Sequence, residues 1–483
     1  MKRNRYFHLL AWSVGLASSL GCRASGSEEP ARAEQTGPST SAVEAVDKNE
    51  PLAKAELGLS SNKKGPKHPH EVWLVDQSNT AGLTHGGTLY IYASAQLQSD
   101  AATAVPEVID LGGATSALCL AETGVAPVRP HMLVFNEPDA THAILAFVAS
   151  GHVVFFDAGT RAPLRCFRTE VGAGGARQAH AVSSTPDGHY ALVANQNGKK
   201  LERIATDYKN NLFVQDPSAT LDLAGCTTPN GSPCQHVSLR PDTAPICPFV
   251  PSTGFPAYIS LRGGGMFAVN PNSTPMSIVA EYESPIIPRD GCGFVEAKGW
   301  VYGNGGGGSA LNPDGWFIYR VPQGDANVYK ASNGPNTPAP EVIDHDTSDP
   351  RDAHGVAKTK DESYVWFFDR AANVAEIFHA KTGDFVATVD LVNPQLSTDP
   401  TPDLVSEAPD GQFFYASLRG PNPLTGDPHA STGTTPGLLV IEVLNHGQLG
   451  AVRGIARINN IDAGGVQRAD AHGIRARRLN ADD

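Results

Sequence analysis

Short stretches in which apolar and polar residues alternate recur along the chain, and most run through a polar turn into a second apolar stretch. Alternation with a period of two is typical of a β-strand that buries one face. Segments such as 180–195 (HAVSSTPDGHYALVAN) and 354–369 (HGVAKTKDESYVWFFD) therefore predict a strand, a turn and a second strand. No amphipathic helical pattern of comparable length follows the N-terminus, so the pattern predicts an all-β fold.

This unit occurs seven times, at intervals of roughly 50 to 70 residues, which is the range expected for a propeller blade. Radial repetition of such units predicts a β-propeller. We call the first residue of each unit its opener, because it occupies the same place at the start of each predicted inner strand. The seven openers are His131, His180, His236, Cys292, His354, Asp403 and His472.

The two ends of the repeat region predict how the ring closes. Residues 71–79 resemble the second strand of a blade with no first strand before it, whereas residues 472–478 resemble a first strand with nothing after it. Strands from both ends would complete one blade and remove a free sheet edge. The sequence therefore predicts a seven-bladed ring, and a miscounted divergent segment would make it six or eight.

One repeat shows the resemblance of this chain to a known family. Residues 354–392 read HGVAKTK, SYVWFFD, NVAEIFHAKTG and DFVATVDLV in successive strands, which resembles the YVTN repeat of bacterial propellers. The resemblance extends over residues 72–479. It implies a seven-bladed propeller related to bacterial lactonases, and it makes a lactonase-like hydrolase one of the functions to consider.

The N-terminus predicts export. Residues 1–22 join a basic start to an apolar stretch at 9–20, which is too short to span a membrane, and they end in Ser-Leu-Gly-Cys. This ending resembles a lipobox and implies lipidation of Cys22, with an outer-membrane anchor; the alternative is an ordinary secretory signal. Residues 23–66 lack aromatic residues and predict a disordered tether, and residues 67–483 form the predicted propeller domain.

Charge and cysteine content narrow the possible partners. The net charge is −13 and the sequence has no basic stripe. Because phosphate binding needs clustered Lys and Arg, we do not expect the protein to bind nucleic acid. Apart from Cys22 the chain has six cysteines, an even number that predicts disulfides in an exported protein. Cys226 and Cys234 bracket a turn-rich loop and are the leading pair. Proximity in the blade arrangement suggests pairing Cys119 with Cys166 and Cys247 with Cys292, among 15 formal pairings for six cysteines.

Strand direction places the openers on one face. Adjacent strands of a blade are antiparallel, so the turn after each second strand lies on the same face as the openers. The predicted metal ligands are a subset of His131, His180, His236, His354 and His472, with copper or another transition metal as the candidate. The other predicted ligand-binding residues of this face are Asn197, Arg262, Cys292, Arg370, Asp403 and Arg419.

The histidines have two interpretations. They could hold strand geometry, hydrogen bonded to backbone or to Asp352 and Asp470, or these two carboxylates could orient metal-bound imidazoles. A ring of histidines in a seven-bladed propeller also resembles nitrous oxide reductase, which implies copper, although Cys292 and Asp403 depart from an all-histidine ring. Three functions stay open. They are an envelope-anchored scaffold that binds a small molecule or envelope protein, a metal-dependent oxidoreductase, and a lactonase-like hydrolase.

Overall fold

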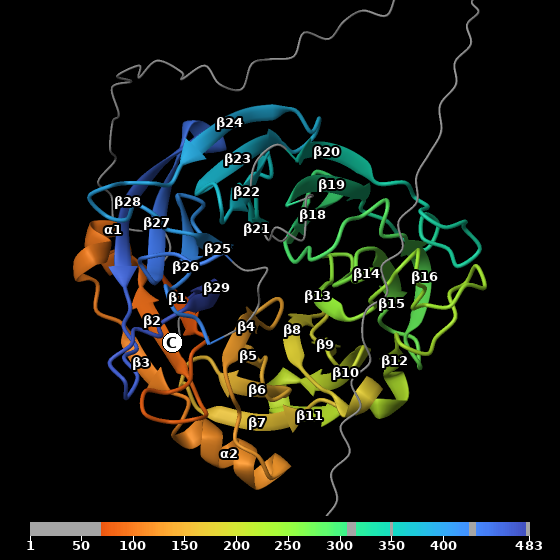
Figure 1. Ribbon diagram of the computed structural model, residues 1–483, viewed down its shortest axis with the longest axis horizontal. Coiled ribbons are helices and arrows are strands. Elements are labelled where there is room, and N and C mark those ends of the chain that lie inside the picture. Colours follow the sequence, from red (N-terminus) through yellow and green to blue (C-terminus); the bar gives the residue numbers. More distant parts are fainter. Residues whose placement is uncertain (1–68, 307–314, 348–350, 425–430, 480–483) are drawn as a thin grey trace, which may run out of the picture. The chain divides into compact units, whose positions relative to one another are not determined.

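The structure of the protein is a computed structural model that describes residues 69–306, 315–347, 351–424 and 431–479. In these residues, seven antiparallel sheets stand around one axis as the blades of a propeller (Figure 1). The predicted fold class and blade number are therefore confirmed. The predicted signal segment 1–22 with Cys22, and the whole of the predicted tether 23–66, lie outside the described residues.

The strands of the first four blades follow one another along the chain, except that the C-terminal β29 belongs to blade 1. Blade 1 consists of β29 (Ala471–Arg478), β1 (His70–Asp76), β2 (Thr88–Ala93) and β3 (Glu107–Asp110). Blade 2 consists of β4 (Pro130–Phe135), β5 (His142–Phe147), β6 (His152–Asp157) and β7 (Pro163–Arg168). Blade 3 consists of β8 (Ala179–Ser184), β9 (Tyr190–Asn195), β10 (Lys200–Asp207), β11 (Leu212–Gln215) and the short β12 (Leu221–Asp222). Blade 4 consists of β13 (Pro245–Phe249), β14 (Ala257–Leu261), β15 (Met266–Asn270) and β16 (Ser277–Tyr282).

The remaining three blades complete the ring. Blade 5 consists of β17 (Phe294–Ala297), β18 (Trp300–Gly306), β19 (Trp316–Pro322) and β20 (Glu341–Asp346). Blade 6 consists of β21 (Ala353–Lys358), β22 (Tyr364–Asp369), β23 (Val374–His379) and β24 (Phe385–Asp390). Blade 7 consists of β25 (Pro402–Glu407), β26 (Phe413–Leu418), β27 (Gly437–Leu444) and β28 (Leu449–Arg457).

Blade 1 is closed by strands from both ends of the repeat region. The C-terminal β29 is the inner strand and pairs antiparallel with β1, with Leu74 opposite Ile474. The closure also carries a buried ion pair, because Arg477 Nε lies 2.5 Å from Glu71 Oε1 and the Arg477 side chain is fully buried. Arg161 of blade 2 binds the other oxygen of Glu71 at 2.7 Å. The ring is therefore fastened by hydrogen bonds within blade 1 and by charges between blades 1 and 2.

A β-bulge turns most openers toward the axis. In six of the seven described blades the register of the inner strand shifts near its start, at the opener in all of these except blade 4, as between Ala353 and Val356 in β21 or between Pro402 and Val405 in β25. A bulge bends its strand and re-aims the extra side chain. The repeated position that the sequence shows as an opener therefore corresponds, in most blades, to a bulge at the start of the inner strand.

The prediction for His236 was wrong. The inner strand of blade 4 is β13, whose bulge places Ile246 where the other blades have their openers. His236 instead bridges Arg240 within a segment that precedes β13. The buried Arg240 guanidinium donates hydrogen bonds to the carbonyl oxygens of Cys234 and Pro233. These bonds fold residues 233–240 into a local turn that is separate from the inner strand of blade 4.

Apolar side chains fill the axis next to the openers. Met132, Ile246 and the disulfide-linked Cys247 and Cys292 are buried in one cluster. Leu404 of blade 7 packs against this cluster and against the core between blades 7 and 1. Side chains from blades 2, 4, 5 and 7 thus contribute to one apolar cluster beside the polar openers.

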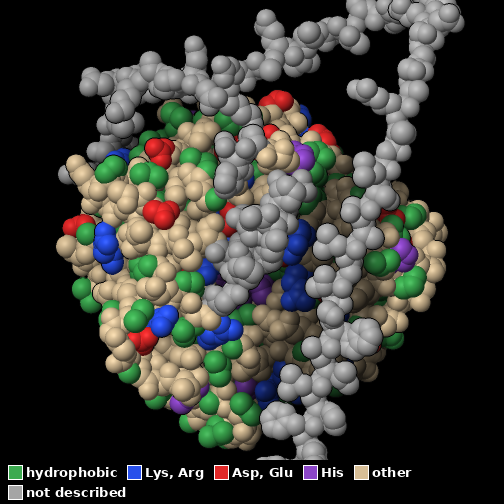
Figure 2. Space-filling view, viewed as in Figure 1, with side chains coloured by type: hydrophobic (Ala, Val, Ile, Leu, Met, Phe, Trp, Pro, Cys, Tyr) green, Lys and Arg blue, Asp and Glu red, His purple; other side chains and the backbone are tan. Residues whose placement is uncertain are grey.

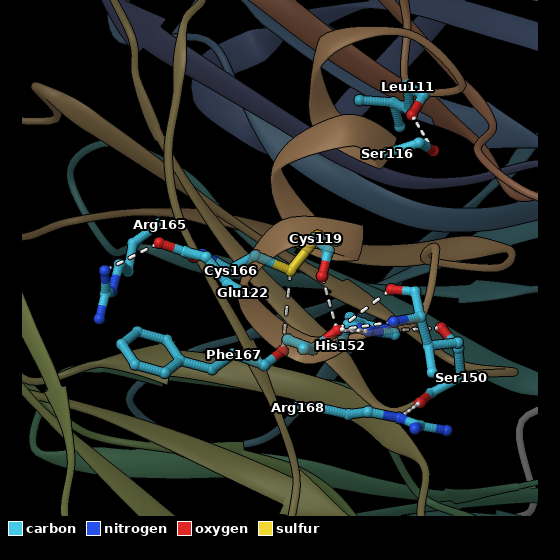
Figure 3. The surroundings of a disulfide bond; sticks show 12 residues. Leu111, Ser116, Cys119, Glu122, Ser150, His152, Arg165, Cys166, Phe167 and Arg168 are labelled. Carbon is cyan, nitrogen blue, oxygen red and sulfur yellow. Dashed lines mark hydrogen bonds and ion pairs between the residues drawn. A yellow bond between two sulfur atoms is a disulfide. The ribbon is translucent and has the colours of Figure 1, made fainter.

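Two short helices were not predicted from the sequence. They are α1 (Ser94–Asp100) and α2 (Ala114–Thr123), both in the connections that follow strands of blade 1. Helix α2 lies against β7 of blade 2, where the Cys119–Cys166 disulfide and the Glu122–Arg165 ion pair attach it (Figure 3). Neither helix approaches the length and apolar character that a bilayer span requires.

Three disulfides are present. Cys119 is joined to Cys166, Cys226 to Cys234, and Cys247 to Cys292. These are the pairings expected from the loop at 226–234 and from blade proximity. The first joins α2 to blade 2, the second closes a loop before β13, and the third joins the inner regions of blades 4 and 5.

The closure predicts a large effect of one buried arginine. Replacing Arg477 with Leu leaves Glu71 with Arg161 and the Trp73 indole as its described partners, and breaking a buried ion pair costs about 3 kcal/mol or more. We expect the urea midpoint of unfolding to fall accordingly. Arg478→Leu is the matched control, because this neighbouring residue of β29 is exposed and its replacement should cost about 0.5 kcal/mol or less. Equal losses in the two variants would contradict the role assigned to Arg477.

Candidate functional site

Four opener histidines form a continuous row at the axis. The rings of His131 and His472 stack with centroids 3.8 Å apart and planes 14° apart. His180 meets His131 edge to face at 4.6 Å, and His354 lies 5.8 Å from His472. We call these histidines, with Asp403, Arg370 and Arg419, the axial cluster. Figure 2 shows His side chains, together with Lys and Arg side chains, near the middle of one face.

Asp403 joins the histidines to the arginines. One carboxylate oxygen, Oδ2, accepts a hydrogen bond of 2.5 Å from His472 Nδ1, and Arg419 Nη1 lies 3.4 Å from it. The other oxygen, Oδ1, accepts from Arg370 Nη1 at 3.0 Å. His354 Nε2 lies 3.3 Å from Oδ1, but its direction makes no hydrogen bond. Asp403 is fully buried, so these groups supply the solvation that water would otherwise give it.

Opposite charges alternate around the axis on one side of the ring. Arg370 binds Asp352 at 2.7 Å as well as Asp403, and Arg419 binds Asp470 at 2.7 Å as well as contacting Asp403. The order Asp352, Arg370, Asp403, Arg419, Asp470 runs from blade 6 through blade 7 to blade 1. Each arginine is thus shared by two carboxylates. Ion pairs link blade 6 to blade 7 and blade 7 to blade 1.

Asp352 and Asp470 act differently from the sequence prediction. Both were predicted as partners of the histidines that follow them, His354 and His472. Asp352 instead binds Arg370 and the hydroxyl of Ser431, and Asp470 binds Arg419 and Gln77. The carboxylate beside both histidines comes from Asp403 of blade 7.

Acceptors fix which nitrogen of His131 and His472 carries the proton. His472 Nδ1 faces a carboxylate oxygen, which can only accept, so Nδ1 donates. Gln77 donates its amide to Asp470 and therefore turns its oxygen toward His131 Nδ1, 2.9 Å away. His180 Nδ1 faces the carbonyl oxygen of Ile246 at 3.0 Å. In all three rings Nδ1 is the donor, and in the neutral ring Nε2 carries the lone pair.

Burial keeps two of the imidazoles uncharged. Burial, followed by the neighbouring His472 and His180, places the pKa of His131 well below the ordinary histidine value. Burial, followed by the Arg370 guanidinium, does the same to the pKa of His354. Burial alone would raise the pKa of Asp403, but the neighbouring side chains of His472 and Arg419, followed by His354 and Arg370, hold that pKa well below its usual range. The carboxylate is therefore charged while His131 and His354 are neutral at pH 7.

Several buried nitrogens of the axial cluster have no hydrogen-bond partner among the described residues. Those that can accept include His131 Nε2, His472 Nε2 and one nitrogen of His354, whose Nδ1 and Nε2 are both without a bond. Arg370 Nε is a buried donor without a partner. More than nine tenths of buried polar groups in native proteins are paired, so several exceptions at one place require an explanation. They mark the place where a ligand could bind.

The other predicted site residues do not join this cluster. Cys292 is bonded to Cys247, so its sulfur is not a free ligand, and the prediction that it binds a ligand was wrong. Arg262 is half-exposed and pairs with Asp242 and Asn197 at the rim of blades 3 and 4. The structure brings together Arg370, Arg419 and Asp403, as predicted from their place on one face. Both arginines, however, are already paired with carboxylates.

Polar residues at the ends of second strands fasten the inner strands. Asp76 Oδ1 accepts from the Asp470 amide at 3.0 Å, and Asp369 Oδ1 accepts from the Asp352 amide at 3.0 Å. Asn195 accepts likewise from the amide of Gln178. These bonds hold the backbone two residues before an opener, so these residues position the site without contacting the imidazole nitrogens that face it.

Comparison with solved structures shows the same fold in proteins from three bacteria. A Bacteroides fragilis protein described as a "putative 6-phosphogluconolactonase" has a TM-score of 0.51 and 13% identity, over 85% of this chain and 98% of that chain. A Lactobacillus plantarum protein has a TM-score of 0.55 and 11% identity, over 85% and 100%. A Bacteroides uniformis protein with the same description as the first has a TM-score of 0.51 and 12% identity, over 84% and 99%. No family model and no curated protein sequence matches this chain. At identities this low, the likeness shows that the propeller fold is shared and carries no argument about activity.

The neutral histidines predict a pH dependence of stability. A histidine whose pKa is lowered on folding takes up a proton more readily in the unfolded chain, so its contribution is complete above about pH 6.5 and is lost as the pH falls. In the His354→Gln variant, the free energy of unfolding should fall less between pH 6.5 and 5.5, by about 1 kcal/mol. Urea midpoints at both pH values give this difference. Parallel slopes for the variant and the wild type would show that His354 is not held neutral.

Proposed function

We propose that the protein is an envelope-anchored propeller that binds a ligand at the axial cluster. The observation that carries this proposal is the group of buried nitrogens without partners on His131, His354 and His472. They belong to blades 1, 2 and 6 and lie beside Asp403, both of whose carboxylate oxygens are already hydrogen bonded. Buried imidazole nitrogens without partners are suited to ligand binding, because the ligand restores the hydrogen bonds or coordination that burial removed.

Charge indicates the class of ligand. Arg370 and Arg419 carry two positive charges, and Asp352, Asp403 and Asp470 carry three formal negative charges. An anion would have to compete with carboxylates that already hold both guanidiniums. The unpaired imidazole lone pairs instead favour a cation or a neutral hydrogen-bond donor. This argues against the notion that the axial arginines bind phosphate or carboxylate.

The same arrangement favours binding over acid–base catalysis. A general base works best when its pKa lies near the working pH. The pKa of Asp403 is held far lower, and both its oxygens are engaged by other groups. The lactonase-like alternative therefore has no residue of the axial cluster to support it, and the likeness to the Bacteroides structures concerns the fold.

Export and anchoring complete the proposed function. The three disulfides suit an oxidising compartment outside the cytoplasm. The lipobox-like ending at Cys22 would hold the propeller at the bacterial envelope through a lipid, most simply at the outer membrane.

Anchoring is tested by replacing the lipidated residue. In the Cys22→Ser variant we expect the protein to move from the membrane fraction to the soluble periplasmic fraction, because a lipid chain supplies the membrane affinity. Fractionation followed by immunoblotting measures this. Unchanged membrane association of the variant would contradict lipid anchoring through Cys22.

Ligand binding is tested on protein taken from its native envelope without a histidine tag. Native mass spectrometry of the wild type should show a stoichiometric non-covalent mass increment. The increment should be lost from His354→Ala and His131→Ala, whereas His236→Ala should keep it, because His236 lies outside the cluster. A bare protein mass for the wild type, or an increment that all variants keep, would contradict binding at the axis. In parallel, hydrolysis of 6-phosphogluconolactone that is lost in the axial variants would favour the lactonase alternative.

A further inference from the structure

We propose that the axial cluster binds one transition-metal ion of the copper or zinc class through His354 and His472, beside Asp403. This inference rests on the ligand-binding function proposed above and names its ligand. Within the described part of the chain, these three residues are the one group of histidine, cysteine or acidic side chains whose ligand atoms all lie within 4.8 Å of one another. All three side chains are buried.

The surroundings of His472 are those of a metal-binding histidine. Histidines that bind metals almost always donate their second ring nitrogen to a carboxylate or carbonyl oxygen, which fixes the ring and its tautomer. His472 donates Nδ1 to Asp403, and its Nε2 is buried without a partner. Arg370 and Arg419 hold Asp403 in turn. The ring that would bind the ion is therefore positioned by a carboxylate that is itself fixed from two neighbouring blades.

His131 supports the same ring from its other side. It stacks on His472 at 3.8 Å, and its own Nδ1 is held by Gln77. The stacked planes are nearly parallel, 14° apart, so His131 positions the ring of His472 by stacking against its face. His354, whose two ring nitrogens make no hydrogen bond, is the partner that faces Asp403 from blade 6.

Charge and ligand type restrict the metal. With three carboxylates and two guanidiniums the surroundings have a formal charge of −1, which a monovalent or divalent ion offsets. Magnesium and calcium prefer several oxygen ligands, whereas the one carboxylate here is already shared by two arginines and a histidine. Imidazole nitrogens favour copper and zinc.

The test uses the full chain with Cys22→Ser, without a histidine tag and stripped of metal by a chelator. Titration with Zn²⁺ and with Cu⁺, by competition against a chromophoric chelator, should show one equivalent bound, and Mg²⁺ and Ca²⁺ should not compete. Visible spectroscopy after loading with Co²⁺ should show bands of a nitrogen-coordinated ion. His354→Ala and His472→Ala should each weaken binding by about 100-fold or more, because each removes a direct ligand, whereas loss of an orienting group costs 10- to 100-fold.

Controls separate metal binding from folding. His236→Ala is the matched control, because this histidine lies in the segment before β13, outside the axial cluster. The metal affinity of this variant should equal that of the parent chain. Where an alanine variant fails to fold by circular dichroism, His354→Gln or His472→Gln keeps the volume and removes the imidazole. The proposal is overturned if no ion binds at one equivalent, or if the folded axial variants bind as tightly as the parent. If metal does not bind but the native mass increment persists and still depends on His354, the metal assignment is wrong and axial ligand binding stands.

Discussion

The axial site depends on the buried carboxylate of Asp403. An isolated carboxylate at this depth would cost several kcal/mol or more, so the fold must surround it with compensating groups. They come from three blades: Arg370 and His354 from blade 6, Arg419 from blade 7, and His472 from the C-terminal strand of blade 1. The closure of the ring by β29 is therefore a condition for the site, because it brings His472 to Asp403.

The two sides of the axis are built differently. Blades 6, 7, 1 and 2 are linked by alternating charges and by Gln77, which connects Asp470 to His131. Blades 4 and 5 are linked by the Cys247–Cys292 disulfide and by apolar side chains such as Ile246. The unpaired nitrogens of the site all belong to the polar side.

The sequence carried enough information to predict the blades but not the partners. A repeated opener marks a repeated bulge, so counting openers predicted seven blades, and strand direction predicted that His354, Asp403 and His472 share a face. His236 is also a histidine at the start of a similar sequence segment, yet hydrogen bonds from Arg240 keep that segment apart from the inner strand. The periodicity of apolar residues does not reveal these bonds. Arg370 and Arg419 looked available for an anion because their carboxylates, on Asp352, Asp403 and Asp470, lie on other strands or in other blades and become neighbours only in the folded chain. Helix α2 was missed because it is short and attached to its blade by a disulfide and one ion pair, and not by a strong amphipathic pattern.

The central claim is that acceptors from neighbouring blades hold the axial imidazoles in one tautomer, with Nε2 left for a ligand. The most direct test is long-range ¹H–¹⁵N NMR of protein labelled with ¹⁵N in its histidine rings, freed of metal at pH 7 and assigned by single substitutions. The account predicts that His131 is a neutral ring with its proton on Nδ1 and a non-protonated Nε2, and that His472 carries a proton on Nδ1. A charged His131, or a proton on its Nε2 with Nδ1 bare, would contradict the account.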